Sequence, residues 1–218
     1  KIAGHLLEAA EADIKFQNGR FLIDGTDQSV SIEDVAKTAY LPLTLPLEIE
    51  PTLVASAAFK PSAPTFPNGC HFCEVEVDPE TGVTDIKTYI VIDDVGTVIN
   101  PMLLEGQIHG GISQGLGQAI CEDLNYDPEN GQLISASFLD YCMPRADDMC
   151  SIEVIPASVP SPTNPLGIKG AGEAGCVGAL PCIQSALIDA LRHLGINDIP
   201  MPATPFKLWT LLSQDHKT

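Results

Sequence analysis

The sequence has few basic residues and lacks a long apolar run. Eleven Lys and Arg residues stand against 29 Asp and Glu residues, which gives the 218-residue chain a formal net charge of −18. Nucleic acids and anionic membrane surfaces are bound through basic patches, so this balance argues against both classes of partner. No apolar stretch approaches the roughly 20 residues that a membrane-spanning helix needs. We therefore expect no nucleic-acid partner and no membrane span.

A secretory signal is also missing from the start of the sequence. The opening "KIAGHLLEAAEADI" mixes charged residues and alanine at helical spacing, with Lys1 already inside the pattern. We therefore expect the chain to be a piece of a longer protein. Its seven cysteines are odd in number and scattered, which predicts a reduced, cytoplasmic setting. Cys70 and Cys73 form a C-x-x-C motif, but only His71 is at hand as a further metal ligand, and ordinary strand and turn cysteines are favoured.

The apolar patterning predicts an α+β fold, with a mixed or antiparallel sheet and packed helices. Hairpin signals favour antiparallel pairing. We divide the chain into residues 1–67, comprising a helix, a hairpin and a proline-rich connector, and a core of residues 68–218. The predicted elements, in order, are a helix over 1–13, a hairpin turning at Asn18-Gly19, a helix capped by Ser31, the connector over 41–67, strands 71–77 and 83–93, a helix from Pro101 capped by Asn100, the strand "SIEVIP", a loop over 157–173, a helix over 175–194 and a helix capped by Thr204.

The segment "NPLGIKGAGEAGCVGALP", residues 164–181, places one carboxylate, Glu173, among glycines and alanines. Three interpretations compete. Glu173 could complement the positive end of the helix that follows, a contribution of about 0.3–1 kcal/mol. "GAGEAG" matches the G-x-G-x-x-G of a phosphate loop, although no Rossmann-type strand precedes it and a carboxylate would repel phosphate. The acid could also be a catalytic base beside a bulky cofactor that needs close backbone approach.

A second glycine-rich segment, "GQIHGGISQGLGQ", lies in the predicted helix after Pro101. Each glycine inside a helix costs about 1 kcal/mol relative to alanine, a cost that is tolerated where a backbone or a ligand packs very close. Gln107 and Gln114 are seven residues apart and therefore share one helix face. Their amides could bind a heterocycle or a phosphate. The alternative is a close helix crossing with solvated glutamines. Two glycine-rich, ligand-permissive segments in one small domain favour a bound ligand.

Three long motifs, in this order, resemble the molybdenum hydroxylase family, which includes xanthine dehydrogenase, aldehyde oxidase and aerobic carbon monoxide dehydrogenase. They are "HFCEVEVDPETG", "DDVGTVINPMLLEGQIHGGISQGLGQAICED" and "GIKGAGEAGCVGALP". The resemblance extends from Lys1 to about Leu212 and corresponds to the C-terminal part of the family's large, molybdopterin-binding subunit. It implies that residues 1–67 and 68–218 belong to the same molybdopterin-binding region.

The resemblance also implies roles for individual residues. Glu173 aligns with the family's active-site glutamate, which accepts a proton from a hydroxyl bound to molybdenum. Gly172 would let the cofactor approach, and Gln107 falls where the family has an amide that contacts molybdopterin. The expected reaction is oxidation of an aldehyde, an N-heterocycle or a related small substrate, with water as the source of oxygen.

Further residues carry over with less definite roles. Gln114 and Gly115 match a neighbouring Q-G segment of the molybdopterin site. Gly170 belongs with the cofactor-binding residues of the K-G-x-G-E-x-G segment, where Lys169 either holds the loop or touches the polar end of the cofactor. Cys176 lies near Glu173 in sequence, and buried packing is favoured for it over chemistry. No residue of this chain is expected to ligate the metal directly.

The implied partners lie outside this chain. They are the remaining part of the molybdopterin-binding subunit, iron–sulfur and flavin domains or subunits that carry 2Fe-2S clusters and FAD, and a small-molecule substrate. An iron–sulfur cluster needs more cysteines than Cys70 and Cys73 provide. Two other hypotheses remain: a non-catalytic module for assembly or cofactor docking that is inactive without the missing part, and a nucleotide-binding domain that uses "GAGEAG".

Overall fold

The structure, a computed structural model, describes residues 1–213 apart from the side chain of Pro42. Residues 214–218, the end of the predicted core segment, lie outside the described part. The chain divides into two compact units, Lys1–Lys60 and Pro61–Thr218. The division falls inside the predicted proline-rich connector, and the membership of both segments in one cofactor-binding region stays a prediction. Each unit is described by itself.

The first unit is a small three-stranded sheet with two helices. Strands β1 (Ile14–Gln17), β2 (Arg20–Ile23) and β3 (Ser29–Ser31) pair antiparallel in that order, and helix α2 (Ile32–Tyr40) follows directly. Asn18 and Gly19 have φ angles of 50° and 76°, as a two-residue hairpin turn requires, which confirms the predicted hairpin. Ser31 accepts a hydrogen bond from the Asp34 amide and is the predicted N-cap. The core of this unit is Ile2, Ala3, Val35 and Ala39.

The predicted helix over residues 1–13 is wrong in its extent. Helix α1 covers only Ile2–Leu7, and Glu8 ends it in the left-handed conformation with φ 52°. The chain then folds back, so that the Ala9 carbonyl oxygen occupies the space a Cβ at Gly4 would need, at 2.8 Å. A short 3₁₀ turn, Glu11–Asp13, leads into β1. The alanine-rich pattern is helical in propensity, and tertiary packing over Gly4 overrides it.

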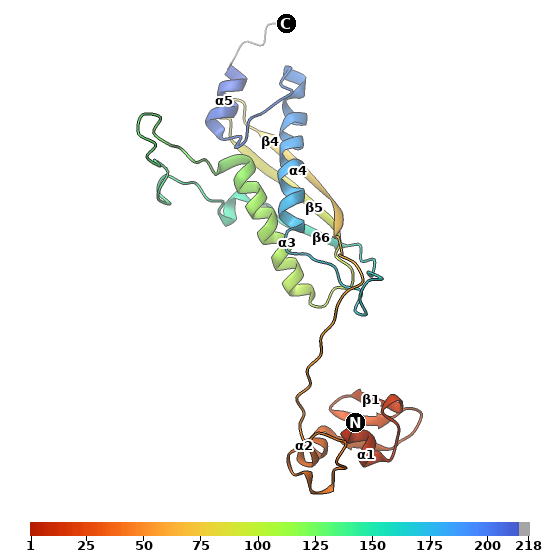
Figure 1. The fold of residues 1–218 in the computed structure, drawn as a ribbon. Helices are drawn as coiled ribbons and strands as arrows, with labels where there is room; N and C mark the ends of the chain where they lie inside the picture. The colour runs from red at the N-terminus through yellow and green to blue at the C-terminus, as the bar shows by residue number, and fades with distance from the viewer. Residues whose placement is uncertain (214–218) are drawn as a thin grey trace. The chain divides into compact units, whose positions relative to one another are not determined.

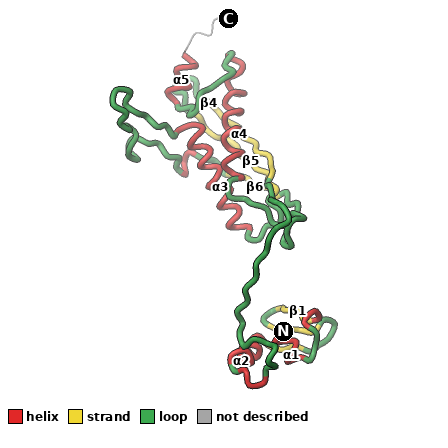
Figure 2. Tube along the Cα trace, in the orientation of Figure 1, coloured by secondary structure: helices red, strands yellow, loops and turns green. Residues whose placement is uncertain are grey.

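The second unit contains a mixed three-stranded sheet and three helices (Figures 1 and 2). Strands β4 (Asn68–Val77) and β5 (Thr84–Asp94) form the predicted antiparallel hairpin, and β6 (Ile152–Pro156) pairs parallel with β5. The helices are α3 (Pro101–Leu116), which continues as a π-helical turn (Gly117–Cys121), α4 (Ala174–Leu191) and α5 (Pro205–Ser213). The predicted α+β class with a mixed sheet is therefore confirmed. The predicted last helix extends to Gln214, which lies outside the described residues.

Helices α3 and α4 lie side by side over the sheet and enclose the core with it (Figure 1). The fully buried side chains come from β5, α3, α4 and α5. Along β5 buried residues alternate with less buried ones, as expected of a strand with one face on the core. Helix α5 adds one buried side chain at the far end of the pair. The largest of these core residues are Tyr89, Val91, Ile108, Ile112, Leu116, Ile183, Leu187 and Leu208.

Helix α4 corrects the expectation about long apolar segments. An 18-residue window within Ala174–Leu194 has a mean hydropathy of 1.5, and the helix is long and apolar enough, by length and composition, to cross a membrane. The same helix buries Ala179, Ile183 and Leu187 completely in the core of the second unit. Core helices of globular units meet the same criterion, and the packing favours that role here.

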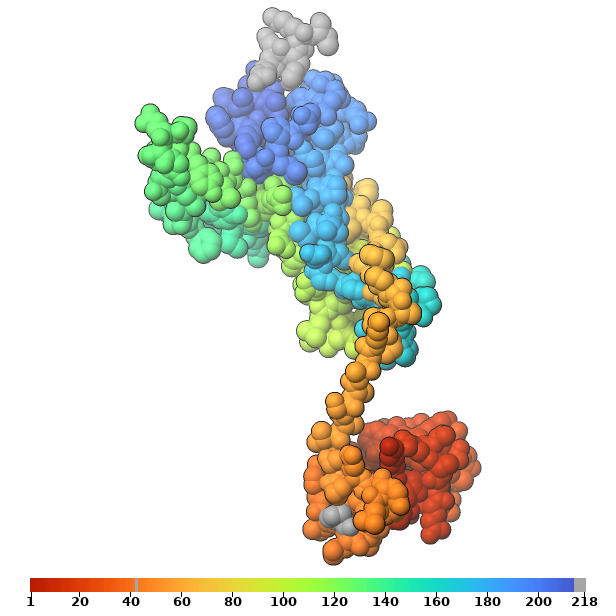
Figure 3. Space-filling view, in the orientation of Figure 1, coloured from red at the N-terminus to blue at the C-terminus, as the bar shows by residue number. Residues whose placement is uncertain are grey.

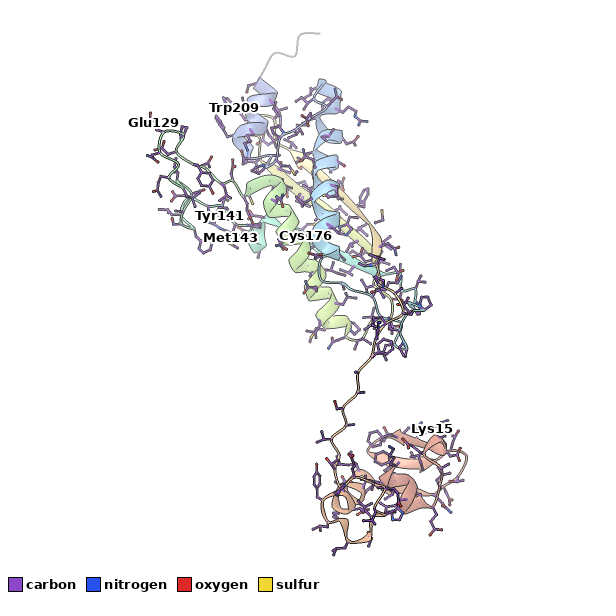
Figure 4. All side chains as sticks on the ribbon, viewed as in Figure 1. Lys15, Glu129, Tyr141, Met143, Cys176 and Trp209 are labelled. Atoms are coloured by element: carbon purple, nitrogen blue, oxygen red, sulfur yellow. The ribbon has the colours of Figure 1, made fainter. Side chains whose placement is uncertain are left out.

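A long excursion, residues 122–149, connects the π-helical turn to β6 and projects from the unit as a lobe (Figure 3). Glu129 lies at its tip, and Tyr141 and Met143 lie toward its base (Figure 4). The Tyr141 hydroxyl donates to the Glu122 carboxylate at 2.5 Å, which ties the two ends of the excursion together. This hydrogen bond raises the pKa of Tyr141.

Candidate functional site

The crossing of α3 and α4 explains part of the glycine-rich sequence. A Cβ at Gly111 would lie 2.9 Å from the Cys176 amide nitrogen, and one at Gly175 would lie 2.5 Å from the Ile108 carbonyl oxygen. A Cβ at Gly115 would lie 2.6 Å from the Ala179 Cβ. Side chains at these positions would force the helices apart, so the glycines are what permits the close approach. The interpretation of a helix crossing is thus confirmed for these glycines.

Gly115 has a structural role in this packing, and its place in the cofactor site stays a prediction. Gly115 is buried against α4, whereas Gln114 beside it is exposed. The predicted contact of Gly115 with a cofactor would have to be made through a backbone that α4 already covers. Cys176 is half-buried at the same crossing, where Figure 4 places it between the two helices. The expectation that Cys176 serves packing agrees with this position.

Two other glycines of α3 face open space. A Cβ at Gly106 or Gly110 would meet no atom within 4 Å, and both residues are exposed, as is Gln107 between them. The helix therefore has a crossing face, occupied by α4, and a bare glycine-lined face. The crossing therefore does not explain why glycine, which is unfavourable in a helix, occupies these two positions on the bare face. A ligand-permissive surface and a close crossing coexist on one helix.

The bare face of α3 is joined to the Glu173 loop by a direct hydrogen bond. The Gln107 side chain donates through Nε2 to the Gly172 carbonyl oxygen at 2.7 Å. These residues are 65 positions apart in sequence, and two of the predicted site residues are thus brought into contact. Gly170 and Gly172 are exposed, and a Cβ at either would meet nothing within 4 Å. The loop backbone is accordingly open to a large ligand.

Glu173 occupies the N-cap position of α4 without acting as a cap. Its side chain accepts no capping hydrogen bond from the helix, and the residue is exposed. The first N–H groups of any α-helix lack intrahelical partners, so the start of α4 is a site suited to an anion or an oxygen acceptor. The carboxylate is therefore not used to satisfy the helix end. That argues against the purely structural interpretation of Glu173.

Lys169 holds the loop that carries Glu173. Its Nζ donates to Asp94 Oδ2 at 2.5 Å, and both side chains are largely buried. Asp94 Oδ1 accepts from the Gly96 and Val159 amides, each at 2.9 Å. The Lys169 ammonium, followed by these two amides, holds the pKa of Asp94 well below its usual range. Of the two roles predicted for Lys169, anchoring of the loop is the one the contacts support.

The loop before Glu173 contains no strand of the Rossmann type. Between β6 and α4, the described residues form a single isolated bridge, Gly96 with Ile168, and otherwise turns. Gly167 has a φ of 68°, and its carbonyl oxygen accepts from the Thr97 and Ser161 amides. The strand–turn–helix context of a dinucleotide-binding loop is therefore missing, as expected from the prolines of this segment.

Two acids at the end of β5, Asp93 and Asp94, are absent from the residues predicted from sequence. Both are buried, and Asp93 Oδ1 lies 3.7 Å from Nε2 of His71 on β4. His71 Nδ1 shares a hydrogen bond of 2.7 Å with the hydroxyl of Tyr89, whose pKa is raised chiefly by burial. The available signal was the pair "DD" directly after the apolar run "YIVI". Two charges at the end of a buried strand need partners inside the fold.

The C-x-x-C motif does not form a pair in the structure. Cys70 and Cys73 are three positions apart on β4 and therefore project to opposite sides of the strand. Cys73 faces Cys182 of α4. Interaction with Cys73, and then with His71 and Tyr89, lowers the pKa of Cys182 to about 7, while the pKa of Cys73 is raised. Within residues 1–213, no cluster of three or more His, Cys, Asp or Glu residues could hold a metal ion.

The hydrogen bond of Gln107 can be tested against its neighbour on the same helix. We expect Gln107→Ala to lower the free energy of unfolding by about 0.5–1.5 kcal/mol, the usual net contribution of one hydrogen bond. The exposed Gln114 side chain on the same helix has no hydrogen-bond partner in the described part of the chain, so Gln114→Ala is the matched control with the same gain in helix propensity. Urea denaturation of the two variants measures the difference. Equal stabilities would contradict the Gln107–Gly172 bond.

Comparison with known proteins places this geometry in context. Residues 1–150 match the family model described as "Molybdopterin cofactor-binding domain". The carbon monoxide dehydrogenase large chain of Hydrogenophaga pseudoflava is 36% identical over 215 residues, which cover 98% of this chain and 26% of that protein. The nicotine 6-hydroxylase large subunit of Paenarthrobacter nicotinovorans is 38% identical over 209 residues, covering 95% of this chain and 26% of that protein.

A solved structure resembles the chain along nearly its whole length. The quinoline 2-oxidoreductase of Pseudomonas putida 86 superposes with a TM-score of 0.86 at 37% identity, over 98% of this chain and 27% of that one. The chain thus spans about a quarter of the length of the curated relatives it matches. The family-model match ends at residue 150, before Glu173, whereas the pairwise similarities extend over the Glu173 loop.

Proposed function

Because the chain belongs to the molybdopterin cofactor-binding domain family, we propose that it supplies the face of a molybdenum hydroxylase active site that carries the general base, Glu173. The relatives with which it aligns are large chains about four times as long. The active enzyme would therefore combine this chain with the remaining part of the large subunit, and with iron–sulfur and flavin domains or subunits that carry electrons away. A cytoplasmic location stays a prediction.

The observation that carries the proposal is the contact between Gln107 and Gly172. This hydrogen bond joins the bare face of α3 to the loop in front of Glu173, so that an amide, an open backbone and a carboxylate surround one exposed surface. Nothing within the described unit uses the Glu173 carboxylate as a helix cap. A general base needs to be fixed in position and also free to take up a proton.

The residues on this surface fit a molybdopterin cofactor. The Gln107 amide can donate to and accept from a pterin, and the glycine backbones at 170 and 172 leave room for it. The unpaired N–H groups at the start of α4 suit an anionic or carbonyl oxygen. When bound, the cofactor supplies the electron sink and the metal centre that the protein side chains lack. Gln114 stays a predicted contact at the edge of the same face.

The protein groups would divide the work among them. Glu173 accepts the proton that is released when water-derived oxygen is transferred to the substrate, and holds it on a carboxylate oxygen. Gln107 holds the carbonyl of Gly172, the residue before Glu173, and thereby fixes the direction of the Glu173 side chain. Lys169 and Asp94 anchor the loop from its other side through a largely buried ion pair. Positioning of this kind is worth several powers of ten in rate when reacting groups are aligned.

The substrate class we propose is an N-heterocycle, an aldehyde or a similarly small electron-poor molecule. The names of the relatives support a small substrate: nicotine, quinoline and carbon monoxide. Attack by an oxygen nucleophile on an electron-poor carbon is the chemistry that a carboxylate base of this kind assists. Nothing on the exposed face of α3 discriminates between these substrates, so the remainder of the large subunit would select among them.

Oxidation over many turnovers in isotopically labelled water, with an electron acceptor present, tests this function. The complete enzyme containing this chain is incubated in H₂¹⁸O with quinoline, an aldehyde or carbon monoxide, and the product is analysed by mass spectrometry. We expect ¹⁸O in the product when the label is in the water, and none when the label is in O₂. Incorporation from O₂, or no turnover with any of the substrate classes, would contradict the proposal.

A non-catalytic role in assembly or cofactor docking is favoured by one observation of its own. Glu173 and Gln107 are both exposed on the surface of the described unit, and a catalytic base normally works in an enclosed, water-poor site. The chain alone would then present a docking face that becomes catalytic once the rest of the large subunit covers it. Metal analysis of the purified chain distinguishes the cases, because stoichiometric molybdenum on this chain alone would exclude the docking role.

A further inference from the structure

A cavity of about 140 Å³ lies between the first turns of α4 and the facing ends of β4 and β5. Its apolar wall is formed by Ala174 and Val177, directly after Glu173 in the sequence. Its polar wall is formed by Asn68, which donates to Asp94, and by His71 and Asp93, whose side chains are only 5% and 6% exposed. None of these groups takes part in the proposed proton transfer, and the cavity lies inside the second unit.

Neither carboxylate oxygen of Asp93 has a hydrogen-bond donor among the residues that the structure describes. Oδ1 lies 3.7 Å from His71 Nε2, and Oδ2 is buried and has no partner among residues 1–213. The neighbouring acid at this end of β5, Asp94, forms an ion pair with the Lys169 ammonium, so this cation does not pair with Asp93. A buried acceptor that is left unpaired is costly, so a donor from outside the described chain is expected at this carboxylate.

The surrounding backbone is built to admit these two side chains. Gly69 pairs with Asp93 in the β4–β5 register, and a Cβ at Gly69 would lie only 1.9 Å from Asp93 Oδ1. Gly178 of α4 lies over the His71 ring, where a Cβ would lie 2.4 Å from Nε2. Two glycines on separate elements therefore make room for one imidazole and one carboxylate. Packing that tight is a feature of a formed site and not of a loose surface.

The histidine is fixed so that its free nitrogen faces Asp93. Nδ1 is occupied by the Tyr89 hydroxyl at 2.7 Å, and the Tyr89 side chain is 1% exposed. The two rings also meet edge to face, with centroids 5.7 Å apart. The ring therefore cannot turn without breaking a buried hydrogen bond, and Nε2 is held beside Asp93 as a second polar group of the wall.

The geometry points to a binding site for a cationic N–H donor, a guanidinium or an ammonium group, with the Asp93 carboxylate as its acceptor and Ala174 and Val177 against its apolar side. The cavity is large enough for a group of the size of methylguanidinium. The charge of the wall is unbalanced, and the chain as a whole carries an excess of acids. A charged hydrogen bond to a buried carboxylate is among the stronger polar interactions in proteins.

Two sources could supply such a group: an arginine or lysine side chain from the rest of the large subunit, or a free small amine or guanidine. Either would tie the first turn of α4, and with it the position of Glu173, to the ends of β4 and β5. The inference stands on the buried groups alone and does not depend on the proposed reaction. Failure of the ¹⁸O experiment would leave it intact.

The test is a titration of the 218-residue chain with methylguanidinium and methylammonium, followed by calorimetry and by the ¹⁵N signals of the His71 ring. We expect saturable binding and a shift of the His71 signals, with no binding of tetramethylammonium, which has the charge but no N–H. Asp93→Asn should weaken binding at least tenfold, whereas Asp189→Asn, an exposed acid on α4, should leave it unchanged. Binding of tetramethylammonium, equal binding by Asp93→Asn, or no saturable binding would overturn the inference.

A second variant keeps the test independent of whether Asp93→Asn folds. Val177 is 66% exposed at the edge of the cavity, so Val177→Arg can place its own guanidinium against Asp93 with little disturbance. We expect Val177→Arg to abolish binding of methylguanidinium and to raise the melting temperature, and Val177→Leu to do neither. The complete enzyme distinguishes the two sources. If its cavity no longer binds added methylguanidinium, a side chain of the large subunit is the natural donor. If the cavity still binds it, the natural donor is a free ligand. Binding by Val177→Arg equal to that of the unaltered chain would exclude the cavity as the site.

Discussion

Glu173→Gln in the complete enzyme is expected to lower the turnover number by about 10²–10⁴-fold, the usual contribution of a general base. The amide keeps the size and shape of the side chain but cannot accept the proton. Since the Glu173 side chain makes no capping hydrogen bond, the substitution should leave α4 and the loop in place. Molybdenum content, measured by elemental analysis of the same preparation, should stay near that of the unaltered enzyme.

A matched control separates loss of the base from loss of a charge. Glu129 is an exposed acid at the tip of the excursion over residues 122–149, away from the α3–α4 face, and Glu129→Gln should keep full activity. Loss of molybdenum together with activity in Glu173→Gln would mean that Glu173 holds the cofactor and is not the base. Unaltered turnover would remove Glu173 from the mechanism.

Local signals predicted many of the element boundaries, because they act within a few residues. Asn100 accepts from the Leu103 amide and begins α3 beside Pro101, as its position before an apolar run predicts. The Thr204 hydroxyl likewise accepts a hydrogen bond from the Lys207 amide at the start of α5. The end of α1 escaped prediction, because the left-handed Glu8 depends on the chain folding back over Gly4.

The parts of the site that could not be predicted are contacts between residues that lie far apart in the sequence. Gln107 and Gly172 could each be singled out from their glycine-rich surroundings, but their contact depends on how α3 crosses α4. The wall of His71 and Asp93 needs β4, β5 and α4 to meet. Its glycines, Gly69 and Gly178, are unremarkable in sequence. Parallel pairing of β6 with β5 is equally invisible, since a strand pattern carries no direction.

The glycines of α3 show the same division between local and distant causes. Gly110 and Gly111 are adjacent in the sequence and equally unfavourable for a helix. One faces open space and the other faces the backbone of α4 near Cys176. A pattern of glycines therefore indicates a close approach, while only the fold shows which glycine packs against a helix and which faces open space.

Alanine at these two positions is expected to have opposite effects on stability. Gly111→Ala should lower the free energy of unfolding by about 1–3 kcal/mol, because its Cβ would lie 2.9 Å from the Cys176 amide nitrogen and force α3 and α4 apart. Gly110→Ala should raise it by up to about 1 kcal/mol, because alanine favours the helix and nothing obstructs it.

Urea denaturation followed by tryptophan fluorescence measures both variants within the second unit, because Trp209 of α5 is the sole tryptophan of the chain (Figure 4). A shift of both midpoints in the same direction would mean that the helices do not cross as closely as described. The strain in Gly111→Ala falls on the first turn of α4, next to Glu173. A complete enzyme carrying that variant should therefore lose turnover as well as stability, whereas Gly110→Ala should keep its turnover per bound molybdenum, because its Cβ meets open space on the bare face of α3.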